Sequence, residues 1–354
     1  MPEFGQLVAE LEATRWTGRP GYGVKTLLGA CLVKHVFALP TWTRVTALIG
    51  EHWRLQRVLD CEGDPPSHWS VYRFVRKLRE NGESVERCID AVVEGLKAKL
   101  PTYGTDLAID ASDMPAYANG QRYVSKDSEV ERNWHTDPDA SWGHRSAVST
   151  RRGGGFFGYR LHMATCAATD LPVAWSVETA KANETRFAAD LIDTAQRRGC
   201  MAATAAMDKG YDQRPVYERC AERDCLPLIP LRQTPDVKRG DHRPPECQHG
   251  VWTFAGADRN RGATKWRCPT GECKPASTWV AADRLHPLIP RETKRFKAGY
   301  RKRAAVEREF GRLKNQWGLK PLRVRGLDRV RLHADLTVLT KLACALSRVR
   351  ASPT

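Results

Sequence analysis

Two aspartates stand at the ends of short apolar runs, where they could carry out metal-dependent chemistry. Asp110 follows the run 107–109, and Asp208 follows the run 202–207. Functional groups of α/β sheets gather at strand ends, and two carboxylates at neighbouring ends would repel each other or hold a cation. Such oxygen ligands suit Mg²⁺ or Mn²⁺. The alternative for each is a turn or strand-end cap, which is how we interpret Asp113 and Asp212.

A third carboxylate, Glu307, lies in the segment 300–314, which lacks proline and is rich in helix-forming residues. We therefore expect one helix. At about 100° per residue, its buried stripe comprises Val306, Phe310, Leu313 and Trp317. A neighbouring stripe comprises Tyr300, Arg303, Glu307 and Lys314. Three carboxylates holding two metal ions would form a clamp for phosphodiester chemistry, whereas an ordinary amphipathic helix with surface ion pairs is the alternative.

The remaining charged residues of this segment are expected to face solvent. The helical wheel directs Arg301, Arg308 and Arg312 away from the buried stripe. It also places Glu309 on the solvent side, so Glu309 ranks below Glu307 as the third carboxylate.

Positive charge is concentrated in the last part of the chain. The formal net charge is +16, and residues 291–350 hold 18 Lys and Arg against 5 Asp and Glu, which is 13 of those 16 charges. Such a surface is typical of a protein that binds a polyanion. An anionic membrane is the competing partner, but the basic residues alternate with helix-core positions rather than with apolar anchors. We therefore favour nucleic acid.

Hydropathy indicates a soluble, intracellular protein that does not enter the membrane. No apolar run approaches the roughly 18 residues that span a bilayer, and residues 1–18 lack a signal-peptide pattern. Most of the 11 cysteines lie singly in apolar surroundings, as expected in a reducing compartment.

Two cysteine motifs differ from the others. Cys247-x-His249 and Cys268-x4-Cys273 supply thiols and an imidazole, the ligand types of a structural zinc site. Unpaired cysteines in an irregular loop are the alternative. Three tryptophans of the same segment could stack on unpaired bases or, more commonly, form the core of a small metal-stapled domain: Trp252, Trp266 and Trp279.

The chain is predicted to have three parts. Residues 1–100 should form short helices, equally consistent with a DNA-binding bundle or a plain scaffold. Residues 101–350 run strand, strand, strand, helix, strand, helix, strand, then a further helix, which predicts an α/β mixed sheet with flanking helices. Residues 235–295 interrupt this domain with a Cys- and Trp-rich insertion. The polar segment between Asp110 and Tyr159 is interpreted as a functional or mobile loop.

The pattern Tyr300-x2-Arg303-x3-Glu307-x6-Lys314 resembles the Tyr-Arg-Glu-Lys signature of insertion-sequence transposases with a DDE catalytic triad. Residues 109–112 resemble that family's first-aspartate strand, and residues 207–212 resemble its Asp-x-Gly-Tyr motif. Residues 23–78 resemble its helical N-terminal domain, and residues 333–346 its C-terminal helix. The resemblance therefore spans nearly the whole chain.

The resemblance implies a ribonuclease-H-like fold in which Asp110, Asp208 and Glu307 bind two Mg²⁺ or Mn²⁺ ions. It implies that Tyr300, Arg303 and Lys314 contact the DNA backbone beside the scissile phosphate. Such enzymes bind the terminal inverted repeats of a mobile element, cleave its ends and join the 3′-hydroxyl to double-stranded target DNA. By analogy we expect a dimer in the synaptic complex and a prokaryotic, cytoplasmic, nucleoid-associated protein. The alternatives are a nuclease of the same fold and a domesticated, non-catalytic DNA-binding protein.

Overall fold

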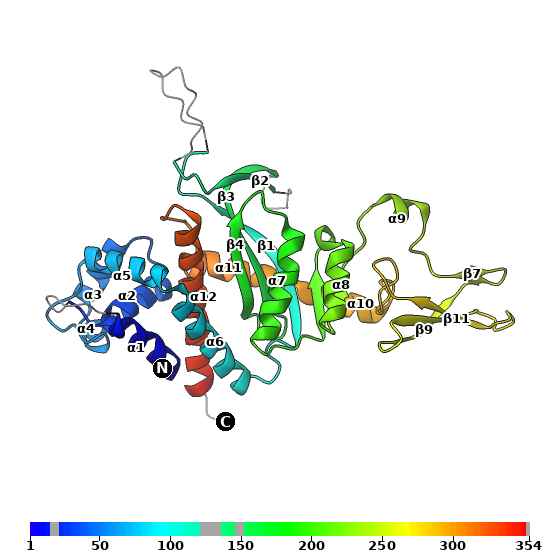
Figure 1. Cartoon of the computed structure of the whole chain (residues 1–354), viewed down its shortest axis with the longest axis horizontal. Helices are drawn as coiled ribbons and strands as arrows, with labels where there is room; N and C mark the ends of the chain where they lie inside the picture. The colour runs from blue at the N-terminus through cyan, green and yellow to red at the C-terminus, as the bar shows by residue number, and fades with distance from the viewer. Residues whose placement is uncertain (15–20, 121–135, 146–151, 352–354) are drawn as a thin grey trace, which may run out of the picture.

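The structure, a computed structural model, describes the chain except for residues 15–20, 121–135, 146–151 and 352–354. Three regions follow one another along the longest axis: a group of N-terminal helices, a central sheet with helices on its faces, and a small β region that projects at the far end (Figure 1). No helix in the described part of the chain combines the length and apolar character needed to cross a membrane.

The first hundred residues form helices, as the sequence predicts. Thr41 and Ser67 cap two of them, because their hydroxyls accept hydrogen bonds from the amides of Arg44 (3.3 Å) and Ser70 (3.2 Å). The elements are a 3-10 turn η1 (Pro2–Phe4), α1 (Gly5–Ala13), α2 (Val24–Val36), α3 (Trp42–Glu51), α4 (Trp53–Val58), α5 (His68–Glu80) and α6 (Gly82–Lys99).

The central sheet has six strands of mixed direction. They are β1 (Asp106–Pro115), β2 (Ser141–Arg145), β3 (Gly154–Cys166), β4 (Pro172–Thr179), β5 (Thr204–Met207) and β6 (Leu226–Leu228). β2 and β4 both pair antiparallel with β3, β3 pairs antiparallel with β1, and β5 and β6 continue the sheet in parallel to β1. This is the ribonuclease-H-like arrangement that the sequence resemblance implies.

Helices cover both faces of this sheet. Figure 1 shows α7 (Glu184–Arg197) and α8 (Arg214–Glu222) in front of it, and α10 (Lys294–Tyr300) and α11 (Ala304–Gln316) behind it. A 3-10 turn, η3 (Arg301–Arg303), joins α10 to α11. The single helix predicted over 300–314 is therefore wrong in its first turn, where tighter i→i+3 bonding replaces the α-helix.

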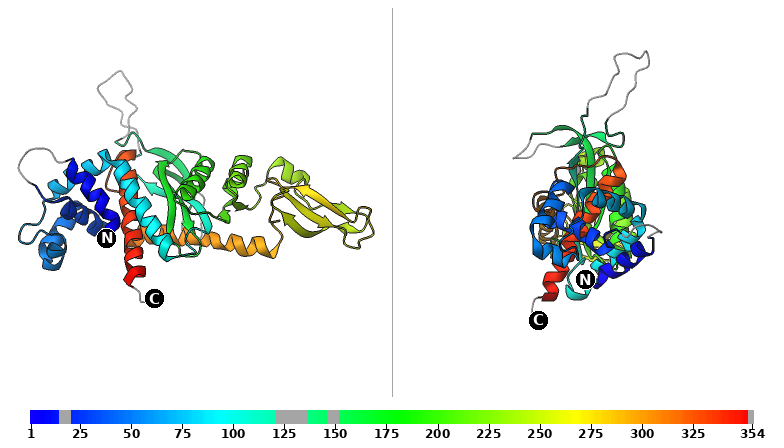
Figure 2. Two further views of the ribbon diagram at one scale, coloured as in Figure 1. Left: turned by 60° about the horizontal axis from the view of Figure 1, so that its bottom comes forward. Right: turned by 90° about the vertical axis from the view of Figure 1, so that its left-hand side faces the viewer.

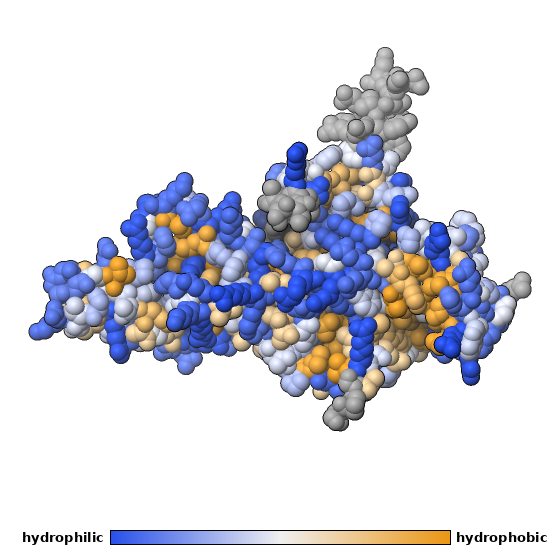
Figure 3. Space-filling model, turned by 180° about the vertical axis from the view of Figure 1, so that it is seen from behind, coloured by the Kyte–Doolittle hydropathy of each residue, from blue (hydrophilic) through white to orange (hydrophobic). Residues whose placement is uncertain are grey.

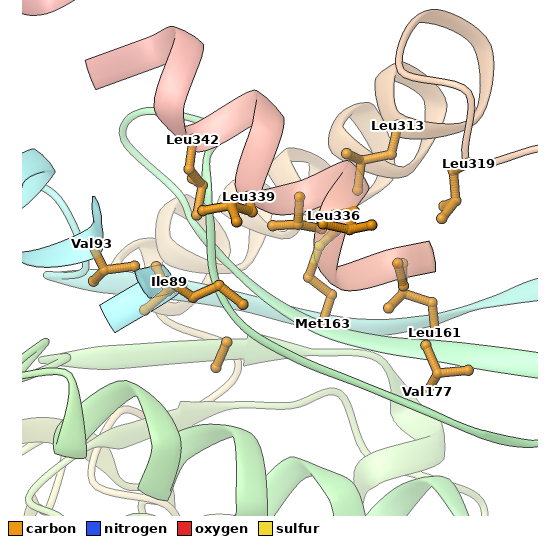
Figure 4. Packing of buried hydrophobic residues seen from close by; sticks show 14 of the residues in the cluster. Ile89, Val93, Leu161, Met163, Val177, Leu313, Leu319, Leu336, Leu339 and Leu342 are labelled. Atoms are coloured by element: carbon orange, nitrogen blue, oxygen red, sulfur yellow. The ribbon is translucent and has the colours of Figure 1, made fainter. Parts of the chain in front are cut away.

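The last helix, α12 (Leu327–Ala351), joins the N-terminal helices to the sheet. It packs against α2 and α6 on one side and β4 on the other, and the left view of Figure 2 shows it between these parts. Figure 4 shows Leu336, Leu339 and Leu342 of α12 directed towards Ile89 of α6 and Met163 of β3. Buried residues from the N-terminal helices and from the sheet accordingly form one continuous hydrophobic cluster.

The insertion has its own small sheet, and its buried residues lie outside that cluster. β9 (Thr253–Asp258), β10 (Ala263–Arg267) and β11 (Ser277–Ala281) form three antiparallel strands, preceded by α9 (Pro235–Arg239) and the hairpin β7 (Glu246–Cys247) and β8 (Gly250–Val251). Trp266 is its largest buried side chain, whereas Trp279 is half-buried, with the Arg261 guanidinium 4.7 Å from its ring centroid. Of the three tryptophans, Trp266 therefore has the expected role of a core residue in this small domain.

The loop predicted between Asp110 and Tyr159 is partly wrong. β1 continues through Asp110 to Pro115, paired with β3 from Met163 to Gly158, and β2 lies within the predicted loop. The hydropathy pattern does not reveal that β1 extends beyond Ile109, because most of this later part is only partly buried and includes the polar residues of the site. Residues 121–135 and 146–151 of the predicted loop lie outside the described chain.

Candidate active site

Asp110 and Asp208 lie side by side at the centre of the sheet. The parallel register pairs Ile109 with Met207, so the two aspartates leave neighbouring strands at the same level. Asp110 Oδ1 accepts a hydrogen bond from the amide of Ala111 (2.9 Å), and Asp208 Oδ1 accepts one from the amide of Gly210 (2.7 Å). Each carboxylate is thereby held by the backbone that follows it. The two strands are thus neighbours, as required for their two carboxylates to lie close together.

Glu307 reaches the same place from the first turn of α11, which packs against β1 and β3. The Arg303 guanidinium lies between two of the carboxylates. Its Nη2 is 2.6 Å from Asp110 Oδ2, and its Nη1 is 2.5 Å from Glu307 Oε1. Arg303 and Asp110 are largely buried, with 19% and 18% of their side chains exposed, whereas Glu307 is 57% exposed.

Tyr300 lies within electrostatic reach of all three carboxylates. Burial raises the pKa of its phenol, the charges of Asp208, Asp110 and Glu307 raise it further, and Arg303 opposes them. The Tyr300 ring stacks on Phe296 at 5.9 Å between centroids. The three predicted carboxylates therefore lie around Tyr300, and two of them bind Arg303, even though Tyr300 and Arg303 do not share a continuous helix with Glu307. Their oxygens do not all lie within 4.8 Å of one another.

The segment from η3 to α11 is tied to β1 at three levels. Lys302 is 2.7 Å from Asp106 at the start of the strand, Arg303 binds Asp110, and the Lys314 ammonium donates to the Ser112 hydroxyl. These contacts align the segment along β1, with Glu307 between Arg303 and Lys314 in the chain. Seen from behind, the side on which α10 and α11 run, hydrophilic residues form a band across the molecule (Figure 3).

Glu309 does not face solvent, and that prediction is wrong. Its side chain is fully buried and pairs with the Lys341 ammonium of α12, while Arg312 Nη1 lies 3.7 Å away. Arg308 and Arg312, also expected in solvent, both bind Asp170 in the β3–β4 turn, at 2.6 and 2.9 Å. A wheel drawn for one buried stripe cannot reveal that α12 covers a second side of α11.

Asp212 makes more tertiary contacts than expected of the turn or cap residue that the sequence suggests. Its carboxylate is fully buried and accepts hydrogen bonds from the Arg232 amide (2.8 Å) and the Tyr217 hydroxyl (3.0 Å). Arg284 of the insertion lies 3.2 Å from it. Asp212 therefore joins the loop that follows Asp208 to the insertion. Only its position, four residues after Asp208, could have drawn attention to it.

Three of the four predicted zinc ligands converge in the insertion. Among the described His, Cys, Asp and Glu residues, the group Cys247, Cys268 and Cys273 alone has all its ligand atoms within 4.8 Å of one another. His249 is not part of that group: its Nδ1 lies 3.4 Å from Glu272 Oε2. In this structure the β7–β8 turn directs the imidazole to a neighbouring carboxylate, and the role of His249 as a zinc ligand stays a prediction.

The fold is ribonuclease-H-like, with two aspartates at the centre of its sheet and Glu307 of α11 near them. The chain belongs to the family described as "Transposase DDE domain", whose model matches residues 104–340. Among solved structures it is similar to a cryo-EM structure of the piggyBac transposase synaptic complex with hairpin DNA. The identity is 12%, the TM-score is 0.45, and the match covers 98% of this chain and 72% of that one. No curated protein matches the chain.

Proposed function

We propose that the protein is an insertion-sequence transposase that binds the terminal inverted repeats of its element, cleaves phosphodiester bonds at the ends and joins the 3′-hydroxyl to target DNA. One observation carries the proposal: Asp110 and Glu307, from a strand and a helix 197 residues apart in the chain, bind the same guanidinium beside Asp208. Membership of the transposase family supports the same conclusion.

The donor set fits divalent metal ions of the hard kind. Asp110, Asp208 and Glu307 offer only carboxylate oxygens, the ligands that Mg²⁺ and Mn²⁺ prefer. The contacts of Arg303 support a cation at this place, because its guanidinium already puts a positive charge between Asp110 and Glu307. Two bound ions would supply activation of the attacking oxygen and stabilisation of the leaving oxygen.

The remaining residues of the site position the carboxylates and the DNA. The amides of Ala111 and Gly210 orient Asp110 and Asp208. Tyr300, Arg303 and Lys314 flank the carboxylates and are proposed to bind backbone phosphates, since cations beside a metal site neutralise phosphate without acting as metal ligands. The helical region 1–100 is proposed to bind DNA as well, and two copies are proposed to pair two element ends at the prokaryotic nucleoid.

A labelled element end, taken from inverted repeats that flank the gene, tests the proposal. Incubated with Mg²⁺ and target DNA, the protein should release a cleaved end and then a larger product in which that end is joined to the target. Cleaved ends without joined product would leave a nuclease and rule out strand transfer. Binding without cleavage would leave a DNA-binding protein.

Arg303→Ala and Lys314→Ala are each expected to weaken DNA binding and to reduce its dependence on log salt concentration by about one charge. The physical reason is that each removed phosphate contact releases about one counterion fewer. Binding titrations at several salt concentrations measure the slope. Arg308→Ala is the matched control on α11, because Arg308 binds Asp170 in the β3–β4 turn and not the carboxylates of the site. A slope unchanged in both variants would contradict a phosphate contact.

We also propose that Cys247, Cys268 and Cys273 hold a structural zinc ion. Cys247 Sγ and Cys268 Sγ are 3.8 Å apart, which is about the edge of a tetrahedron whose zinc–sulfur bonds are ~2.3 Å long. The small sheet buries few side chains, and such domains commonly depend on a metal. Protein purified without added zinc is expected to contain about one zinc ion per chain.

Cysteine variants provide the controls for metal analysis. Cys268→Ser should lose most of the zinc, whereas Cys344→Ser, in α12, should retain it. His249→Ala distinguishes whether the imidazole swings in to complete the site, since zinc loss in that variant would restore His249 as a ligand. A negligible zinc content in the unaltered protein would rule out the site.

A further inference from the structure

A cavity of about 620 Å³ lies where the N-terminal helices meet the start of α12. Its walls come from α2, α3 and α5, from Tyr117 just beyond β1, from the segment 323–325 and from α12. Tyr117 is seven residues after Asp110, so the two Cα atoms are at most about 25 Å apart. The cavity is therefore close to the candidate active site without being part of it.

The charge of this cavity has one sign. Its described lining includes no Asp or Glu and these six cations: Lys34, Arg76, Arg79, Arg323, Arg325 and Arg329. Of these six, Arg76 alone forms an ion pair with a described carboxylate, Glu80 at 3.7 Å. By contrast, a cavity of about 930 Å³ beside α8 is lined by both Asp212 and Arg284, which pair with each other. An excess of cations around a cavity favours an anionic ligand.

Lys34 is the residue of the cavity that most strongly indicates an anionic ligand. Its side chain is buried, with 6% of the residue exposed, and within the described chain no carboxylate pairs with it. The Lys34 ammonium lies over the ring of Trp42, 5.5 Å from Nζ to centroid. Burial lowers the pKa of Lys34 to about 8. An unpaired buried ammonium destabilises a fold, so a bound anion would recover that loss.

Aromatic rings complete the cavity. Tyr72 and Tyr117 are 50% and 44% exposed, which is high for such side chains. The guanidinium carbons of Arg323 and Arg325 each lie 5.2 Å from the Tyr117 ring centroid. Exposed aromatic rings held among cations are the arrangement on which nucleic-acid bases stack while their phosphates are neutralised.

We propose that this cavity binds one unstacked nucleotide of the DNA, with its phosphate at Lys34, Arg323 and Arg329 and its base against Tyr117 and Tyr72. The proposal rests on the proposed function in that DNA is the polyanion. Cavity size supports a single nucleotide, since ligand cavities of 300–1,000 Å³ hold molecules of that order.

The test uses the full chain, a labelled single-stranded oligonucleotide of about 12 nucleotides, and thymidine 5′-monophosphate as the minimal probe. Lys34→Met retains the length and removes the charge, so it should raise the melting temperature without ligand. The same variant should bind the oligonucleotide about tenfold more weakly. Tyr117→Ala and Arg323→Gln should each weaken binding by several-fold. Thymidine monophosphate should raise the melting temperature of the unaltered protein and not that of Lys34→Met.

Matched controls lie outside the cavity. Lys181→Gln removes an exposed lysine that follows β4, and Phe254→Ala removes an exposed aromatic ring of β9. Both residues lie outside region 1–100 and outside the cavity, so both variants should bind the oligonucleotide like the unaltered protein. Equal binding by the cavity variants and the controls would overturn the proposal, as would the absence of any response to either probe. Failure of the proposed transposase function would appear separately, as absent cleavage of element ends by a protein that binds both probes.

Discussion

Asp110→Asn, Asp208→Asn and Glu307→Gln are each expected to slow cleavage of an element end by about 10²–10³-fold or more, the range for losing one preorganised electrostatic group at a reaction centre. Each substitution keeps the size of the side chain and removes one negative charge. The asparagine oxygens can still accept hydrogen bonds from Ala111 and Gly210, which the aspartates accept here at 2.9 and 2.7 Å. The local fold should therefore be retained, whereas the negative charge that would bind a metal ion is lost.

DNA binding separates a catalytic defect from a folding defect in these variants. Because each removes negative charge beside Arg303, affinity for DNA should be retained or slightly increased, as gel shift at constant salt would measure. Asp113→Asn is the matched control on β1: Asp113 lies three residues from Asp110 and is 3.7 Å from Arg145, so cleavage should persist. A triad variant that cleaves at the unaltered rate would exclude that residue from catalysis.

Lys341→Met is expected to lower the free energy of unfolding by about 3–5 kcal/mol, the usual loss when one partner of a buried ion pair is removed. Glu309 would then be buried beside Arg312 alone. Burial raises the pKa of Glu309 to about 7 and lowers the pKa of Lys341, so for both groups the loss of water outweighs their mutual attraction. The double variant Glu309→Leu/Lys341→Met should accordingly recover most of the stability. Urea unfolding measures both.

Glu309 also predicts a pH dependence. Its folded pKa lies above the 4.5 of an ordinary glutamate, so its contribution to stability is complete below about pH 4.5 and declines as pH rises towards 7. In Glu309→Gln this decline should be absent. The control is Arg308→Ala, which breaks an exposed pair with Asp170 and should change stability by less than about 1 kcal/mol. An equally small effect of Lys341→Met would contradict a structural ion pair.

The three carboxylates that the structure brings near one another could be selected from the sequence because their signals are local. An apolar run that ends in aspartate identifies a strand end from a few residues, as at Ile109-Asp110 and Met207-Asp208. The parallel pairing of these strands then places the aspartates together. Glu307 was recognisable from its spacing to Arg303, four residues apart, which the structure preserves as a direct hydrogen bond.

Contacts between distant elements could not be predicted in the same way. Glu309 is buried because Lys341, 32 residues later, covers it, and Asp212 is buried because the insertion returns Arg284 to it. Neither partner lies within a helical or strand period of the residue it neutralises. The Arg303 contact with Asp110 likewise depends on how α11 lies along β1, which hydropathy does not determine.

The position of α12 has a genetic consequence. This helix buries thirteen of its side chains against the N-terminal helices and the sheet together. A premature stop codon before Leu327 would therefore expose the surfaces of the N-terminal helices and of the sheet that α12 covers. It would not release an intact N-terminal fragment. We expect that such a truncated chain does not fold stably and therefore cannot compete with the full-length product.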